Sequence, residues 1–406
     1  MNSEIKFRIK LILLLSLLII LTIILWYPLK LLAVIGLIIV LQIMIIIGMM
    51  ESHLRIQHNI DKKHEQMGSL QHKIDVLIGN ASENNIKNIP VQQKKLPGTF
   101  WGITTFYNPA GYKNKSENYK KFRESSKKQG LKLLCVELAF NGSDFELTKN
   151  DADILLQLRC SSVLWQKERL LNIALDSLPK ECDKVAWVDA EVIFDNDSWI
   201  EETCSLLEKY MIVQPYSSAA FLKKDDQFKE ITDYPWGIGC GKRNNGMAYV
   251  ISNFGKRKLN WFLEHGQPGL AWAGRRKIFD KLNFYDQHIL GAGDLLMAHA
   301  FYDSDNKMLL KKLSAGLKET YCSWRRKIYK EVKGSVYFTD GQIIHLWHGQ
   351  RKNRLYGEID YVLGRYEFDP RHDMKISKNG CFEWNTKKSE LHDDIRQYFF
   401  KRMEDK

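Results

Sequence analysis

Two acidic residues follow a strand-like apolar run near the middle of the chain. Residues 185–188 are strand-forming, and Asp189, Ala190 and Glu191 come directly after them. Because alternate residues of a strand point to the same side, Asp189 and Glu191 are expected to face one ligand beyond the carboxyl end of that strand. Hard oxygen ligands suit Mg²⁺ or Mn²⁺, which bind one or two carboxylates together with substrate phosphates. An isolated tripeptide of this kind is also typical of a solvated turn, so the metal prediction depends on other segments.

Two segments before these acids have residues suited to a nucleotide. Phe106 and Tyr107 end the first predicted strand of the globular part, where the opening loop of an α/β sheet can hold a base. Lys167 and Arg169 lie near the start of a predicted helix, from which their charges can reach a diphosphate. Ordinary strand-to-loop packing and solvated surface charge are the alternative interpretations.

Two later segments supply glycines, a further acid and a pair of histidines. A glycine-rich stretch begins at Gly269, and a second one ends at Asp294, which is placed to meet an acceptor hydroxyl. His345 lies in a predicted strand at 342–346 and His348 follows it, and a neutral imidazole there can complete a metal site begun by carboxylates. Either histidine is a candidate ligand from its position alone.

In their order along the chain, these segments resemble the metal-dependent glycosyltransferases of the GT-A fold. The pattern is similar to that of the beta-1,4-galactosyltransferase and polypeptide N-acetylgalactosaminyltransferase type (family 2-like). Those enzymes have an R-A-K-L-L-N-like helix, a D-x-D or D-x-H strand, a G-G…W-G-G-E block and a final His. The likeness covers about residues 100–349 and implies a Rossmann-like, mostly parallel sheet flanked by helices.

The resemblance also implies a role for each motif residue. Asp189, Glu191 and His348 would hold Mn²⁺ or Mg²⁺, and Asp294 would accept the proton of the acceptor. Glu191 stands where the family usually has Asp, and the stereochemical course of transfer stays open. The donor-binding residues predicted from the resemblance and from the first strand end are Phe106, Tyr107, Lys167, Arg169, Asp189, Gly269 and Trp272.

Composition narrows the classes of partner. The chain has 406 residues and a net charge of +12, with 60 Lys and Arg against 48 Asp and Glu. These charges are scattered and lack the aromatic interleaving of a nucleic-acid groove, so no nucleic-acid partner is expected. The basic balance suits an anionic nucleotide or a membrane surface.

Two uncharged apolar runs, residues 11–27 and 31–50, dominate the N-terminus. Each is close to the roughly 20 residues that cross a bilayer, so they predict a transmembrane helical hairpin. Lys6, Arg8 and Lys10 precede the first run, and this bias predicts a cytoplasmic N-terminus. The protein is therefore expected to be an integral membrane protein with a cytoplasmic catalytic domain, or a lumenal one if both runs form a single anchor.

The remaining chain is expected to contain three parts. A stalk and linker at residues 51–97 is followed by an α/β catalytic domain at 98–350 and a packed C-terminal extension at 351–406. Strands that alternate with helices predict the mostly parallel sheet. A heptad-like stripe within residues 56–77 suggests a homodimer.

The sequence therefore predicts a membrane-anchored glycosyltransferase that moves a hexosyl or N-acetylhexosaminyl group from a nucleotide diphosphate sugar. A uridine nucleotide is the favoured donor, and the acceptor is a glycan, lipid or protein. One alternative is a non-catalytic, membrane-tethered binding module of the same fold. Another is a nucleotidyltransferase, which is expected to have a glycine-rich phosphate loop near the first strand, where none is found.

Overall fold

The computed structural model describes residues 10–19, 93–222, 224, 244–260, 265–354 and 359–406. The chain divides into two compact units, Met1–Glu83 and Asn84–Lys406. In the first unit only residues 10–19 are described, and they are helical. The second apolar run and the stripe at 56–77 lie outside the described residues.

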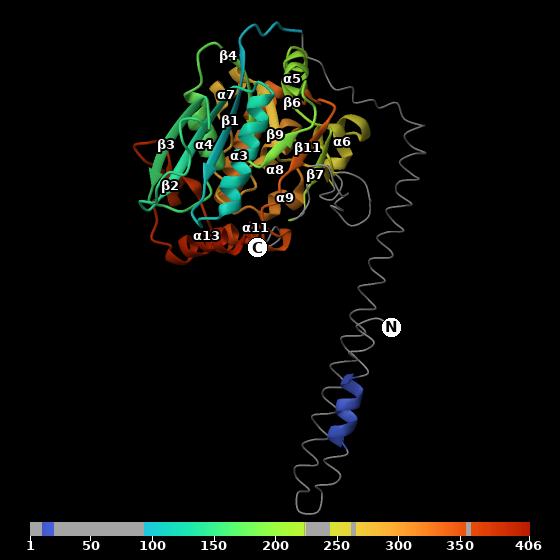
Figure 1. Ribbon diagram of the computed structural model, residues 1–406, viewed down its shortest axis with the longest axis vertical. Helices are drawn as coiled ribbons and strands as arrows, with labels where there is room; N and C mark the ends of the chain where they lie inside the picture. Colours follow the sequence, from blue (N-terminus) through green and yellow to red (C-terminus); the bar gives the residue numbers. More distant parts are fainter. Residues whose placement is uncertain (1–9, 20–92, 223, 225–243, 261–264, 355–358) are drawn as a thin grey trace, which may run out of the picture. The chain divides into compact units, whose positions relative to one another are not determined.

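A central sheet forms the middle layer of the second unit (Figure 1). Its strands pair in parallel except β9, which runs antiparallel to both of its neighbours, β4 and β6. This confirms the prediction of an α/β fold with a mostly parallel sheet. In spatial order the strands are β10 (Val336–Phe338), β6 (Ile212–Gln214), β9 (Ala271–Arg275), β4 (Cys182–Val188), β1 (Thr99–Tyr107), β2 (Leu133–Phe140) and β3 (Ile154–Cys160).

Helices cover both faces of this sheet (Figure 1). One apolar core lies under α4, whose Leu170, Leu171, Ala174 and Leu175 recur at helical spacing and are buried. Beside the opposite face, Phe122 and Trp199 join a second core. Helices that contribute to the first core include α4 (Lys167–Asp176), α6 (Met247–Phe254), α7 (Arg276–Leu282), α8 (Gly293–Phe301), α9 (Lys307–Lys312) and α10 (Ala315–Val332), and those that contribute to the second include α3 (Lys113–Lys128) and α5 (Trp199–Leu207).

A smaller second sheet contains the chain on both sides of the candidate metal ligands. The expectation that Asp189 and Glu191 alternate as in a strand and face one ligand is wrong, because the chain leaves the central sheet after Val188 and turns at residues 189–191. It then enters the second sheet as β5. The strand order of that sheet is β5 (Val192–Phe194), β11 (Gln342–His345), β7 (Ser218–Phe221) and β8 (Asn244–Asn245).

The C-terminal residues pack on the same unit. Helix α13 (Ser389–Lys401) buries Leu391, Ile395, Tyr398 and Phe399 against the first core. The Phe399 ring meets the Tyr107 ring, at the end of β1, with centroids 6.2 Å apart. The other elements of this region are α11 (Ile359–Arg365), α12 (Pro370–Asp373), β12 (Met374–Ile376) and β13 (Phe382–Trp384).

The described helices contradict the prediction of an integral membrane location, with either a cytoplasmic or a lumenal catalytic domain. Within the described ranges, no helix has both the length and the apolar character needed to cross a bilayer.

Trp187 anchors the first core, and its truncation tests how tightly that core is packed. Its ring lies 5.0 Å from Phe279 and 4.9 Å from Phe284, between centroids. We expect Trp187→Ala to lower the free energy of unfolding by about 3–5 kcal/mol in urea denaturation, through lost burial and an unfilled cavity. Met308→Ala, at a side chain that is 64% exposed, is the control and should change it by less than about 0.5 kcal/mol. A loss below about 1 kcal/mol in Trp187→Ala would contradict this packing.

Candidate metal and donor site

The pairing of β5 with β11 brings an acid and two histidines together. His345 pairs with Val192 across these antiparallel strands, and the Leu346 N–H donates to the Glu191 carbonyl at 2.8 Å. His348 follows in the next loop, with its Nε2 3.4 Å from Glu191 Oε1 and 3.0 Å from His345 Nε2. One possible ligand atom from each of the three lies within 4.8 Å of the others. We refer to Glu191, His345 and His348 as the triad.

The protonation of the triad suits a divalent cation. Burial holds the pKa of His345 well below its usual value and lowers that of His348, so both rings are neutral near pH 7. Burial raises the pKa of Glu191, but the neighbouring His348, Lys115 and Arg354 lower it by more than burial raises it. The pKa therefore lies below its usual value, and this carboxyl is ionised. Two neutral imidazoles and one carboxylate form a donor set that first-row divalent metals accept.

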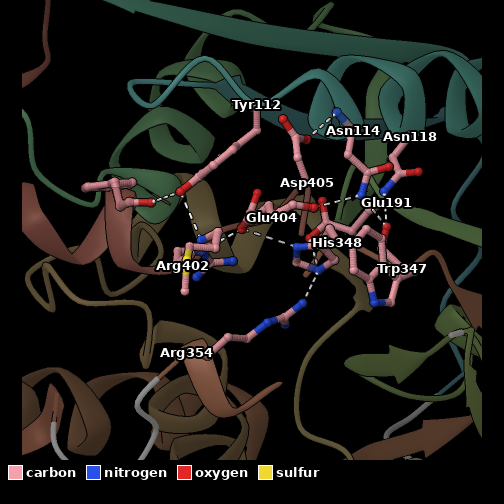
Figure 2. A network of polar contacts seen from close by, with 12 residues as sticks. Tyr112, Asn114, Asn118, Glu191, Trp347, His348, Arg354, Arg402, Glu404 and Asp405 are labelled. Atoms are coloured by element: carbon pink, nitrogen blue, oxygen red, sulfur yellow. Dashed lines mark hydrogen bonds and ion pairs between the residues drawn. The ribbon is translucent and has the colours of Figure 1, made fainter. Parts of the chain in front are cut away.

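A cation already faces one nitrogen of the triad (Figure 2). The Arg354 guanidinium donates to His348 Nε2 at 2.6 Å. A guanidinium has no acceptor atom, so this nitrogen is unprotonated and its single lone pair accepts from Arg354. The triad therefore fits a bound cation in charge and in the unprotonated His348 Nε2, which would bind the ion in place of the guanidinium.

A second cluster of charge surrounds Lys167, the first residue of α4. Its ammonium contacts the Asp189 carboxylate and lies 2.7 Å from Asp294 Oδ2. The Asp189 N–H donates to the Leu270 carbonyl at 2.8 Å, which fixes this acid beside the entry to β9. Burial tends to lower the pKa of Lys167, but the two carboxylates raise it well above its usual value, so the ammonium stays charged.

Glu168 is an acid of this cluster that sequence reasoning missed. It is 2% exposed, and burial raises its pKa to about 8. A Cβ on Gly293 would lie only 2.1 Å from Glu168 Oε1, so the absence of a side chain at the start of α8 makes room for this carboxyl. In the sequence, Glu168 is one acid between Lys167 and Arg169, and nothing in that pattern indicates that its carboxyl is buried.

The structure gathers several predicted site residues but divides them differently. Lys167, Asp189 and Asp294 meet directly, and a Cβ on Gly269 would lie 3.4 Å from Asp294 Oδ2. The predicted metal set of Asp189, Glu191 and His348 becomes a triad in which His345 takes the place of Asp189. The reason is the turn between β4 and β5, which directs Asp189 to Lys167 and Glu191 to His348.

Other predicted donor-binding residues lie outside both clusters. Trp272 is 1% exposed in the core, and its indole N–H donates to the Pro268 carbonyl. Arg169 pairs with Asp286 at 3.3 Å. Phe106 packs against Tyr119 with ring centroids 5.3 Å apart. The donor-binding roles of these side chains stay predictions.

A small hollow lies at the end of β1, where a nucleotide base was expected. Tyr107 contributes to its wall, and the C-terminal residues Phe399, Arg402 and Glu404 contribute as well. The residues that line it are Tyr107, Asn108, Pro109, Ala110, Tyr112, Lys115, Trp165, Phe399, Arg402 and Glu404.

Comparisons with known proteins found similarity only in solved structures. No protein-family model matches the sequence, and no curated protein matches it. TarS of S. aureus in complex with UDP-GlcNAc has a TM-score of 0.35 and 11% identity, over 75% of this chain and 72% of that chain. Drosophila beta1,4-galactosyltransferase 7 has a TM-score of 0.28 and 11% identity, over 50% of this chain and 61% of that one.

A further similar structure belongs to a different chemical class. The 4-diphosphocytidyl-2C-methyl-D-erythritol synthase of Anaerococcus prevotii has a TM-score of 0.28 and 13% identity, over 60% of this chain and 87% of that one. The chemistry of this chain has to be argued from its own side chains.

The raised pKa of Glu168 makes stability depend on pH in a defined direction. The native state keeps a proton on Glu168 up to about pH 8, whereas the unfolded chain releases it near 4.5, so the wild type loses stability as the pH rises between these values. Glu168→Gln cannot ionise. Its free energy of unfolding relative to wild type should therefore rise by on the order of 1–4 kcal/mol from about pH 5 to about pH 8, measured in urea.

The matched control is Glu390→Gln, the same change at an exposed position of α13. Its difference from wild type should be the same at both pH values. An equally pH-independent difference for Glu168→Gln would contradict the raised pKa.

Proposed function

We propose that this protein is a metal-dependent glycosyltransferase that moves a sugar from a nucleotide diphosphate donor to an acceptor hydroxyl. The observation that carries the proposal is the convergence of the triad with the Lys167, Asp189 and Asp294 cluster where the central sheet gives way to the second sheet. A diphosphate needs positive charge, and an acceptor hydroxyl needs a base. The two clusters supply these needs separately.

The triad residues Glu191, His345 and His348 would hold the divalent ion. When bound, Mn²⁺ or Mg²⁺ would act as a Lewis acid that stabilises charge on the leaving diphosphate. Before the ion binds, the buried Glu191 is already negative and both imidazoles are already neutral. The ligands therefore need not lose protons near pH 7.

Lys167 and Asp294 would serve the acceptor side of the reaction. The ammonium of Lys167 lies 2.7 Å from Asp294 Oδ2 and fixes the direction of that carboxylate. Asp294 would then take the proton of the attacking hydroxyl. Asp189, held by the same ammonium, is placed between the two clusters and would contact the donor ribose or sugar.

The finer identity of the substrates belongs to this proposal as well. A UDP-sugar is the favoured donor, and a hexosyl or N-acetylhexosaminyl group is the favoured transferred group. The acceptor would be a glycan, lipid or protein. Assays with a panel of nucleotide sugars and Mn²⁺ would measure release of the nucleoside diphosphate. A pure binding module would release none, and a nucleotidyltransferase would instead form or consume pyrophosphate.

Removal of a triad ligand tests the metal centre. We expect Glu191→Ala and His348→Ala each to lower Mn²⁺-dependent release of nucleoside diphosphate by more than about 100-fold, because loss of a mere outer-shell partner already costs about 10–100-fold. His372→Ala, at an exposed position, should keep wild-type activity. Undiminished activity in both triad variants, with circular dichroism unchanged, would remove the metal site from the mechanism.

Removal of the acceptor base tests the second cluster. We expect Asp294→Asn to lower kcat for transfer by about 10²–10⁴-fold, since a positioned general base contributes about that much. The donor KM should change little, because the lost interaction belongs to the transition state. Asp393→Asn, at a side chain that is 65% exposed, is the matched control. Transfer at the wild-type rate by Asp294→Asn would assign the base elsewhere.

A further inference from the structure

The last residues of the chain dock beside the triad. We call residues 402–405 the C-terminal segment. The Asp405 carboxylate accepts from the backbone N–H groups of Lys113, at 3.2 Å, and Asn114, at 2.9 Å, at the first turn of α3. The Met403 N–H donates to the Tyr112 hydroxyl at 3.0 Å. These bonds fix the segment against the loop and helix that follow β1 (Figure 2).

The same segment is tied to the loop that carries His348. The Asn114 amide donates both to the Glu404 carbonyl, at 3.1 Å, and to the Trp347 carbonyl, at 2.7 Å. Gly349 has a φ of 88°, and a Cβ there would lie 2.9 Å from Glu404 Cα. The absence of a side chain directly after His348 therefore permits the close approach of the two backbones.

The Glu404 side chain enters the site itself. It is 3% exposed and lies 3.3 Å from His348 Nδ1 and 2.5 Å from Arg402 Nε. Burying a carboxylate is costly unless it is paired and hydrogen-bonded, and these two partners supply that pairing. Glu404 thus meets the ring nitrogen of His348 that points away from Glu191 and His345.

The two nitrogens of His348 therefore have different partners. Arg354 can only donate, so Nε2 accepts, and the proton of the neutral ring is on Nδ1. That proton is shared with Glu404 Oε1. Histidines that bind metals usually donate their other ring N–H to a carboxylate or carbonyl, which fixes the tautomer and the ring orientation.

We propose that Glu404 is a positioning residue of the metal site: it holds His348 in the tautomer that presents Nε2 to the ion. The C-terminal segment is then part of the metal site. This inference rests on the proposed metal function of the triad. It gives the C-terminal segment a role in the metal site, although this segment lies far along the sequence from the motifs.

The test is Mn²⁺ binding to the full chain by isothermal titration calorimetry, together with the visible absorption spectrum of the Co²⁺-loaded protein. We expect Glu404→Gln to weaken Mn²⁺ binding by about 10–100-fold and to alter the Co²⁺ spectrum, because the His348 ring loses its charged partner. Glu390→Gln makes the same change at an exposed position and should leave both readouts as in wild type.

A second variant separates orientation from local charge. Glu404→Gln leaves the buried Arg402 without its carboxylate, so the double variant Arg402→Gln/Glu404→Gln removes both charges. Weak binding that persists in the double variant supports a role through His348, and recovery to the wild-type Kd contradicts it. Wild-type binding and an unchanged Co²⁺ spectrum in Glu404→Gln would also overturn the inference. If the wild type itself binds no Mn²⁺, the metal site of the proposed function fails, and the role of Glu404 fails with it.

Discussion

The antiparallel pairing of β5 with β11 is the constraint on which the candidate site depends. These two short strands join the acid that follows β4 to the histidines near the end of the catalytic fold, and the Leu346 N–H to Glu191 carbonyl bond closes the ladder beside the triad. A shift of one residue in this register would turn His345 to the other face of the sheet. Asp189 follows a strand of the central sheet, whereas His345 ends a strand of the second sheet and His348 lies in the loop after it.

Charge in the site is arranged in two groups that meet at the turn between β4 and β5. In one, the ammonium of Lys167 balances Asp189 and Asp294, and Glu168 stays protonated near neutral pH. In the other, an ionised Glu191 faces two neutral imidazoles. Buried charges of this kind contribute little net stability, because desolvation offsets their attraction. Such an arrangement is typical of a functional site, where pKa values are shifted for a task.

Much of the scaffold could be predicted from local pattern. The apolar spacing of α4 and the strand-forming run of β1 match the observed elements. Strand β9 was missed because its Ala and Gly residues lack strand propensity, and only its pairing between β4 and β6 makes it extended. The structure brings Glu191 and His348 together as expected, and their role as metal ligands stays a prediction; the turn that separates Asp189 from them could not be read from the sequence. The position of Glu404 depends entirely on contacts between distant segments.

The most direct measurement is anomalous diffraction from crystals of the protein grown with Mn²⁺ and UDP. The account predicts an anomalous peak between Glu191, His345 and His348, within coordination distance of all three side chains, and diphosphate oxygens on the same ion. A peak held by other residues, or an empty triad beside a bound nucleotide, would contradict it.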